Sequence, residues 1–143
     1  MNERLESFRS LLEAGSPATL STYRSDGTVL ATPVWFRWRE PSTFEVVIAD
    51  GDAKLANLRR DPRCTLLIFE SVPPFRGVEV SGVAEFVDGD LAEARAEIAG
   101  RYLGTEAGRQ FAEKRVARPG VIVRVVGRIR TWDLAGILPT ATR

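Results

Sequence analysis

Hydrophobic residues alternate with polar ones in several short segments of the chain, which is the pattern of β-strands with one buried face. We predict strands over residues 18–23, 28–38, 43–49, 64–69, 75–87 and 120–132. Gly27 lies in a turn that joins the first two strands as a hairpin. Pro33 interrupts the second strand and has no N–H for the ladder, so we expect a bulge or a sheet edge there.

A helical spacing of apolar residues indicates peripheral helices. Leu5, Phe8, Leu11 and Leu12 share one helix face near the N-terminus. A short helix is predicted over residues 53–60, and two more lie between residues 90 and 114. No repeat or linker divides the chain, so we predict a single domain over residues 1–143. Six strands joined by short turns favour a mainly β fold, an antiparallel barrel with peripheral helices.

Composition excludes several kinds of chemistry. The 143 residues include 20 basic and 19 acidic side chains, one cysteine and no histidine. Without histidine there is no imidazole base, no Ser–His or Cys–His nucleophile pair, and almost no basis for a transition-metal site. A net charge of +1 gives no overall field to attract nucleic acid or an acidic membrane. We therefore expect no metal, no nucleic acid and no membrane among the partners.

Targeting signals are also missing from the sequence. The first residues are mixed in charge and contain no apolar core of signal-peptide length. No apolar run approaches the roughly 18–20 residues that cross a bilayer. The lone Cys64 cannot form an intramolecular disulfide. A cytoplasmic location is expected.

One of only two lysines begins a basic segment that follows the third predicted strand. Lys54 and Asn57 lie one turn apart on the helix predicted there, and Arg60 follows on the same element. Cations and an amide at a strand-to-helix turn can hold a phosphate. The alternative is a solvated basic helix face, and the nearby acidic Asp50 and Asp52 argue against a simple anion site.

Three further segments could contact a ligand. Pro33, Val34 and Trp35 place exposed backbone groups beside an aromatic ring, as a flat ligand requires, although the ring could equally fill a barrel or an oligomer interface. The alternating face of the last strand ends at Trp132 and could be a subunit contact, a phosphate clamp or a solvated surface. Gly77 would let backbone approach a ligand closely.

The order of these segments resembles the pyridoxamine phosphate oxidase-like superfamily, whose members bind flavin or deazaflavin in a split β-barrel. The resemblance runs from Ala18 to about Leu134. It rests on residues 18–22, 26–27, 32–36, 53–63, 80–84, 101–104 and 128–132. The lysine, asparagine and Asp-Pro spacing is the most specific element. The aromatic second strand and the Arg-Tyr-Leu-Gly segment look most like the branch that uses coenzyme F420.

The resemblance implies a set of cofactor-binding residues, while the catalytic residues stay unknown. The implied cofactor-binding residues are Lys54 at the cofactor phosphate with Asn57 and Arg60 nearby, Pro33, Val34 and Trp35 facing the ring, Ile48 and Ala49 beside the phosphate, Arg76 and Gly77 near the ring edge, and Trp132 at the C-terminal end. Ala49 stands where relatives often have a hydroxyl. Gly77 stands where the true oxidases have glutamine, and their histidine-bearing substrate motif is missing, which speaks against vitamin salvage.

The resemblance also implies an activity and an assembly. A reduced deazaflavin transfers hydride, and the protein supplies orientation and electrostatics. The leading hypothesis is an F420H2-dependent reductase of an unsaturated or quinone-like small molecule. An FMN-binding oxidoreductase of the same fold and a non-catalytic flavin or F420 carrier are the alternatives. Members of the superfamily are homodimers with the cofactor in a groove between subunits, so a homodimer is expected.

Overall fold

The computed structural model of this chain describes residues 3–139. Its elements, in chain order, are α1 (Glu3–Glu6), α2 (Arg9–Glu13), β1 (Ala18–Tyr23), β2 (Val29–Val34), β3 (Arg37–Arg39), β4 (Thr43–Ala49), α3 (Ala53–Arg60), β5 (Arg63–Phe69), β6 (Gly77–Val87), α4 (Leu91–Leu103), α5 (Thr105–Glu113), β7 (Gly120–Trp132) and the 3-10 turn η1 (Ala135–Ile137). Within this part of the chain, no helix has the length and apolar character that crossing a lipid bilayer requires.

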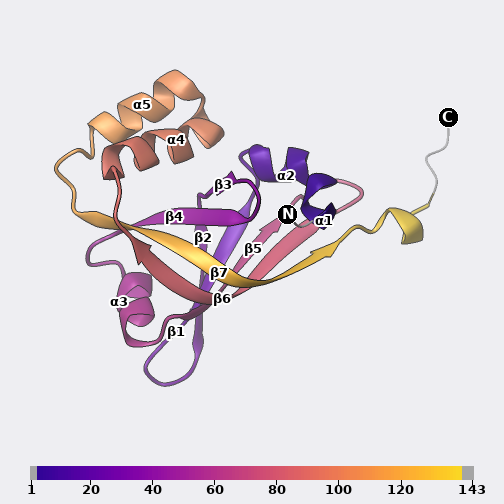
Figure 1. Cartoon of the computed structure of the whole chain (residues 1–143), viewed down its shortest axis with the longest axis horizontal. Coiled ribbons are helices and arrows are strands. Elements are labelled where there is room, and N and C mark those ends of the chain that lie inside the picture. The colour runs from indigo at the N-terminus through magenta and orange to yellow at the C-terminus, as the bar shows by residue number, and fades with distance from the viewer. Residues whose placement is uncertain (1–2, 140–143) are drawn as a thin grey trace.

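All seven strands form one antiparallel sheet in the order β2-β1-β5-β6-β7-β4-β3. The first and last strands in this order, β2 and β3, are consecutive in the chain and are separated only by Trp35 and Phe36. Because so short a connection joins opposite edges, the sheet must curl until its edges meet (Figure 1). This architecture confirms the predicted mainly β, antiparallel split barrel.

The structure has seven strands where the sequence predicts six. The long segment predicted over residues 28–38 is two strands, β2 and β3, because the chain leaves one sheet edge at Trp35 and joins the other at Arg37. Pro33 lies on the edge strand β2, paired only with Thr19 of β1. A proline is tolerated there because no further strand needs its missing N–H.

The core fills the inside of the curl with aliphatic and aromatic side chains. Leu20 of β1, Phe44 and Ile48 of β4, Leu66 of β5 and Val80 of β6 are almost completely buried in one cluster. The N-terminal segment contributes Leu5, Phe8, Leu11 and Leu12 to the same cluster. The single helix predicted there is two short helices, α1 and α2, with Phe8 between them. Figure 1 shows these helices above the sheet and the α4–α5 pair above β4 and β7.

The long strands β6 and β7 touch backbone to backbone at one point. Gly82 and Gly127 face each other in the register. A Cβ on Gly82 would lie 2.0 Å from the carbonyl oxygen of Val126, and one on Gly127 would lie 2.1 Å from that of Ser81. Glycine at both positions therefore allows the close approach, in the middle of a strand pair that curves strongly (Figure 1).

Candidate functional site

A cavity of about 390 Å³ opens between the α4–α5 helix pair, the strands β2 and β4, and the helix α3. Five of the residues predicted to bind a cofactor line it together: Pro33, Val34, Trp35, Ala49 and Lys54. They come from three elements that are separate in the sequence. We call this cavity the α4–α5 pocket.

An aromatic cluster forms one wall of the pocket. The indole of Trp35 stacks on Tyr102 and meets Phe111 at a tilt, with centroids 5.4 Å apart in the second pair. Trp35 is 37% exposed, so the indole remains accessible from the pocket. A flat, partly apolar ligand would find an aromatic surface of fixed orientation here.

Two side chains of α4 fix the backbone beside Trp35. The Phe36 N–H donates to the Tyr102 hydroxyl (3.3 Å), which donates to the Ser16 carbonyl (2.9 Å). Arg101 donates to the Phe36 carbonyl (2.6 Å) and also to the carbonyls of Leu12 and Ala14 at the end of α2. Burial raises the pKa of Tyr102, so the hydroxyl stays protonated and available as a donor. The Arg-Tyr pair thus attaches the connection between the sheet edges to α4.

Lys54 lies in the first turn of α3 and already has a charged partner. Asp52 caps this helix, accepting from the Lys54 backbone N–H (3.0 Å), and its second oxygen pairs with Lys54 Nζ (2.6 Å). Burial works to raise the pKa of Asp52, but the hydrogen bond from Lys54 holds it below its ordinary value. The carboxylate is therefore ionised and offsets the charge of the lysine.

Three arginines line the pocket without a carboxylate partner in residues 3–139: Arg95, Arg115 and Arg118. Arg95 is buried and donates to the backbone carbonyls of Arg115 (2.9 Å) and Arg118 (2.8 Å). The Arg115 guanidinium lies over the Phe111 ring, 3.6 Å from its centroid. Burial, and then the neighbouring charges of Arg115 and Arg118, lower the pKa of Arg95. This end of the pocket is strongly cationic.

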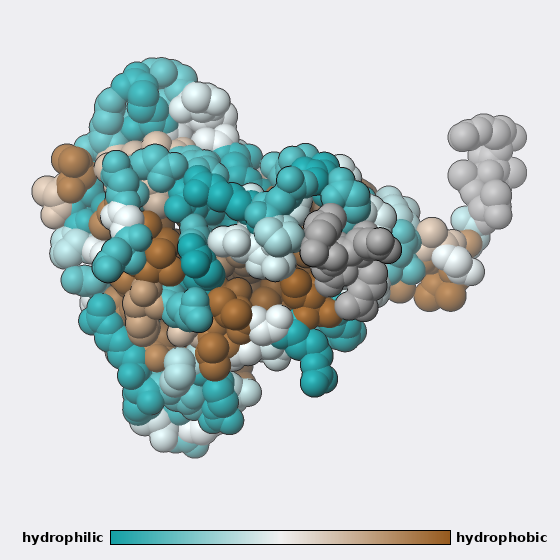
Figure 2. All heavy atoms as spheres, in the orientation of Figure 1, coloured by the Kyte–Doolittle hydropathy of each residue, from teal (hydrophilic) through white to brown (hydrophobic). Residues whose placement is uncertain are grey.

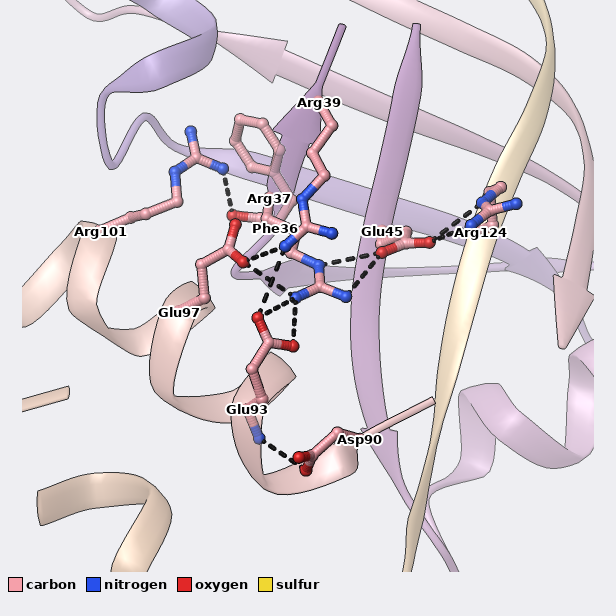
Figure 3. Close-up of polar contacts among 9 residues, drawn as sticks. All are labelled: Phe36, Arg37, Arg39, Glu45, Asp90, Glu93, Glu97, Arg101 and Arg124. Atoms are coloured by element: carbon pink, nitrogen blue, oxygen red, sulfur yellow. Dashed lines mark hydrogen bonds and ion pairs between the residues drawn. The ribbon is translucent and has the colours of Figure 1, made fainter. Parts of the chain in front are cut away.

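A buried ion-pair network fixes α4 against the sheet (Figure 3). Arg37 is 5% exposed and pairs with Glu45 of β4, 3% exposed, at 2.9 Å. It also reaches Glu93 (3.2 Å) and Glu97 (3.1 Å) on α4. Arg124 of β7 binds the other oxygen of Glu45 at 2.7 Å. The network sets the position of the helix that carries Arg95.

Three predicted site residues have structural contacts outside the pocket lining. Asn57 donates to the Thr22 hydroxyl (3.1 Å), and Arg60 donates to the Tyr23 carbonyl (2.7 Å). These bonds attach α3 to β1. Ile48 is buried in the core, because it lies on the opposite side of β4 from the pocket residue Ala49.

The remaining predicted residues, Arg76, Gly77 and Trp132, gather elsewhere on the sheet. Gly77 and Trp132 face each other in the β6–β7 register. A Cβ on Gly77 would lie 1.9 Å from the Trp132 indole, so the glycine makes room for the ring. Arg76 pairs with Glu70 at 2.9 Å. In one copy of the chain these three residues do not line the α4–α5 pocket.

The α4–α5 side of the pocket was absent from the predicted site. Arg95, Ile98 and Ala99 follow one another at helical spacing on α4, and all three line the pocket. An arginine beside the apolar stripe of a predicted helix is the only sequence signal they carried. Phe111, Arg115 and Arg118 come from α5 and the loop behind it. Only the packing of this helix pair reveals their position.

Other chemistry is scarce in the described residues. In residues 3–139 no group of three or more histidine, cysteine, aspartate or glutamate side chains is placed to hold a metal ion. The pocket lining itself contains arginine, lysine and apolar residues, with no carboxylate, thiol or hydroxyl. The lining therefore offers no protein nucleophile or general base.

A family model described as "Pyridoxamine 5'-phosphate oxidase" matches residues 5–133. A comparison with curated proteins found no match. Among solved structures, the conserved hypothetical protein Rv2991 from Mycobacterium tuberculosis is 27% identical, with a TM-score of 0.79, and the alignment covers 100% of this chain and 92% of that one.

Two further solved structures show the same fold. A heme binding protein from Mycobacterium smegmatis is 24% identical with a TM-score of 0.64. The alignment covers 87% of this chain and 51% of that one, so this chain spans about half the length of that protein. A structure described as an F420 reductase is 21% identical with a TM-score of 0.60, covering 85% of this chain and 94% of that one. At these identities the likeness extends to the fold alone.

Proposed function

Since this chain belongs to the pyridoxamine 5'-phosphate oxidase family, we propose that it is an F420H2-dependent reductase of an unsaturated or quinone-like small molecule. One observation carries the proposal. A single pocket combines the backbone and ring of Pro33–Trp35 with Lys54 and a cationic end, on elements distant in the sequence. A ligand that suits it has a flat ring system at one end and an anionic group at the other.

The residues present fit a deazaflavin cofactor. Pro33, Val34 and Trp35 would face the ring, and Lys54 would meet the phosphate, as the family resemblance implies. When bound, the reduced cofactor supplies the hydride. The protein binds and orients the ring, and the apolar lining formed by Val47, Ile98 and Phe111 limits water around it. The absence of an acid–base pair in the lining agrees with chemistry that belongs to the cofactor.

FMN is the main alternative cofactor, because one lysine and an aromatic wall suit either ring. A heme carrier is less well supported, since the chain has no histidine to ligate the iron. The surplus of arginine at the pocket favours the cofactor with more anionic groups, and F420 carries a phosphodiester and a glutamate tail where FMN has one phosphate.

We further propose that the functional unit is a homodimer. Val29 on the edge strand and Val83 and Val126 on the β6–β7 pair are large apolar side chains left exposed in one copy. Figure 2 shows hydrophobic side chains across the middle of the molecule, while the α4–α5 helices above are largely hydrophilic. A second copy would cover apolar surface and could bring its own Trp132 region to a pocket. Light scattering of the purified protein measures the mass directly.

The test of the cofactor is a separate titration with F420 and with FMN, followed by intrinsic tryptophan fluorescence. Trp35 lies at the pocket, Trp38 is buried, and Trp132 lies outside the pocket lining of one copy, so Trp35→Phe should remove the part of the signal that comes from the aromatic wall. Micromolar or tighter binding of F420 with weak FMN binding supports the proposal. Preference for FMN moves the protein to the flavin alternative, and binding of neither rejects both.

Turnover separates a reductase from a carrier. Purified protein with F420H2 and a panel of quinones should oxidise the cofactor well above the rate without protein. Each turnover moves a hydride to the acceptor, and a proton from water completes its reduction. Tight F420 binding with no turnover across the panel would support the carrier and overturn the reductase.

A further inference from the structure

Several arginines of this protein are neutralised by carboxylates. In residues 3–139, at least eight of them form ion pairs with aspartate or glutamate. Arg95, Arg115 and Arg118 have no carboxylate partner in residues 3–139, and all three line one pocket. We call them the arginine cluster. Like charges held together without a counter-charge favour binding of an anion.

The fold holds the cluster together instead of letting its members separate. Arg95 uses two N–H groups to bind the carbonyls of Arg115 and Arg118, which fixes the loop that carries both. This structural role accounts for Arg95. The ring of Phe111 accounts for part of the position of Arg115. No such structural contact explains the position of the Arg118 side chain. Arg118 is exposed, and its side chain makes no hydrogen bond or ion pair within the described chain.

Lys54 and the cluster differ in available charge. Asp52 pairs with Lys54 at 2.6 Å, whereas no acidic side chain lines the pocket. Arg95 lies near the end of β4, the strand that α3 and Lys54 follow, because Arg95 Nη2 is 3.0 Å from the position of a Cβ on Gly120. Gly120 pairs with Ala49, which also lines the pocket. A ligand whose phosphate meets Lys54 therefore has further positive charge in the same pocket.

We propose that the arginine cluster is a second oxyanion site of the α4–α5 pocket, for a carboxylate or phosphate that is bound in addition to the phosphate at Lys54. The inference rests on the proposed function, because it assumes that the flat ligand carries or accompanies such a group. Guanidinium groups suit the task, since each presents several N–H donors in a plane that matches carboxylate or phosphate. The oxyanion has two possible sources, the tail of the cofactor or an anionic acceptor.

The first experiment compares F420 with Fo, the deazaflavin that lacks phosphate and tail. The double variant Arg115→Gln/Arg118→Gln removes two charges and spares the structural Arg95. If the tail of the cofactor is the oxyanion, we expect the double variant to lose about tenfold or more of its F420 affinity while its Fo affinity stays unchanged. Lys114→Gln is the matched control, because Lys114 is exposed, adjacent to Arg115 and outside the pocket lining. An equal loss for F420 and Fo would overturn the proposal.

A second measurement does not depend on F420. Pyrophosphate should raise the melting temperature of the wild-type protein and of Lys114→Gln, but not that of the double variant. Absence of F420 binding together with this pattern would reject the proposed cofactor and keep the oxyanion site. No pyrophosphate shift in the wild type, or the same shift in the double variant, would overturn the site.

Two quantities measured on the double variant identify the source of the oxyanion: its F420 affinity and its KM for a charged and a neutral acceptor. If the cofactor tail supplies it, the double variant loses F420 affinity, and the ratio of KM for a sulfonated naphthoquinone to that for neutral menadione is unchanged. If the acceptor supplies it, F420 affinity is unchanged, and KM rises for the sulfonated quinone alone. Either pattern supports an oxyanion site, and no effect on either quantity overturns it.

Discussion

The rings of Trp35 and Tyr102 stack with their centroids 5.0 Å apart and their planes 11° from parallel. Trp35 belongs to the connection between opposite sheet edges, and Tyr102 belongs to the last turn of α4. The stack therefore ties the aromatic wall of the pocket to the helix that carries Arg95. The proposed ring site and the proposed oxyanion site therefore depend on the same helix.

Removing the hydroxyl of Tyr102 should destabilise the protein. Tyr102→Phe keeps the stack but leaves the Phe36 N–H and the Ser16 carbonyl without their partner. We expect the free energy of unfolding to fall by about 1–2 kcal/mol, measured by urea denaturation. Tyr23→Phe is the control, since no hydrogen bond to the Tyr23 hydroxyl exists within residues 3–139. Equal stability of Tyr102→Phe and wild type would contradict this role.

Charge at Lys54 should tune cofactor binding in both directions. Lys54→Ala is expected to weaken F420 binding by about 1.5–3 kcal/mol, the range of a charge-assisted contact to phosphate. Asp52→Asn keeps a good helix cap but removes the counter-charge, so we expect tighter binding. Fluorescence titration measures both. An unchanged dissociation constant in Lys54→Ala would reject the phosphate contact.

The buried ion pair beneath α4 should matter far more than its exposed neighbour. Arg37→Met leaves Glu45 buried with one of its two partners gone, and we expect a loss of about 3–5 kcal/mol. Arg39 contacts Glu93 and Glu97 of α4, as Arg37 does, but the Arg39 side chain is 51% exposed. Arg39→Met should therefore cost less than about 1 kcal/mol. Similar unfolding free energies for the two variants would refute the distinction.

Alkaline pH should destabilise the protein through Cys64. Burial raises the pKa of this thiol from 9.0 to about 11, so the folded state keeps a proton that the unfolded state releases. Stability is full below the unfolded pKa and is lost as the pH rises from about 9 to about 11, by roughly 2–3 kcal/mol. Cys64→Ala lacks this loss. Unfolding curves of the two proteins that run parallel across this range would contradict the prediction.

The sequence predicts those features that depend on local patterning. Pro33 indicates a sheet edge because its missing N–H is a property of one residue. The helix carrying Lys54 follows from its spacing and its preceding aspartates. The place where a strand changes sheet edge, at Trp35 and Phe36, follows from no local pattern, since both residues suit a continuous strand.

The arginine cluster could not be predicted for a different reason. Its position depends on the α4–α5 pair, which is attached to the sheet by contacts such as Arg37 with Glu93, separated by 56 residues in the sequence. Charge pattern alone does not tell an arginine that faces an acid from one that faces a pocket. Lys54 differs, because the aspartates near it in the sequence already indicate a counter-charge, and Asp52 does pair with it.

The two residues between β2 and β3, Trp35 and Phe36, join the two edges of the sheet through the polypeptide chain. Hydrogen bonds join every other neighbouring pair of strands, but these two edges are held together by the chain itself. One of these two residues, Trp35, also lines the pocket. A ligand that binds against Trp35 in the folded protein and not in the unfolded chain would therefore hold the two sheet edges together, and resistance to unfolding would rise with its concentration.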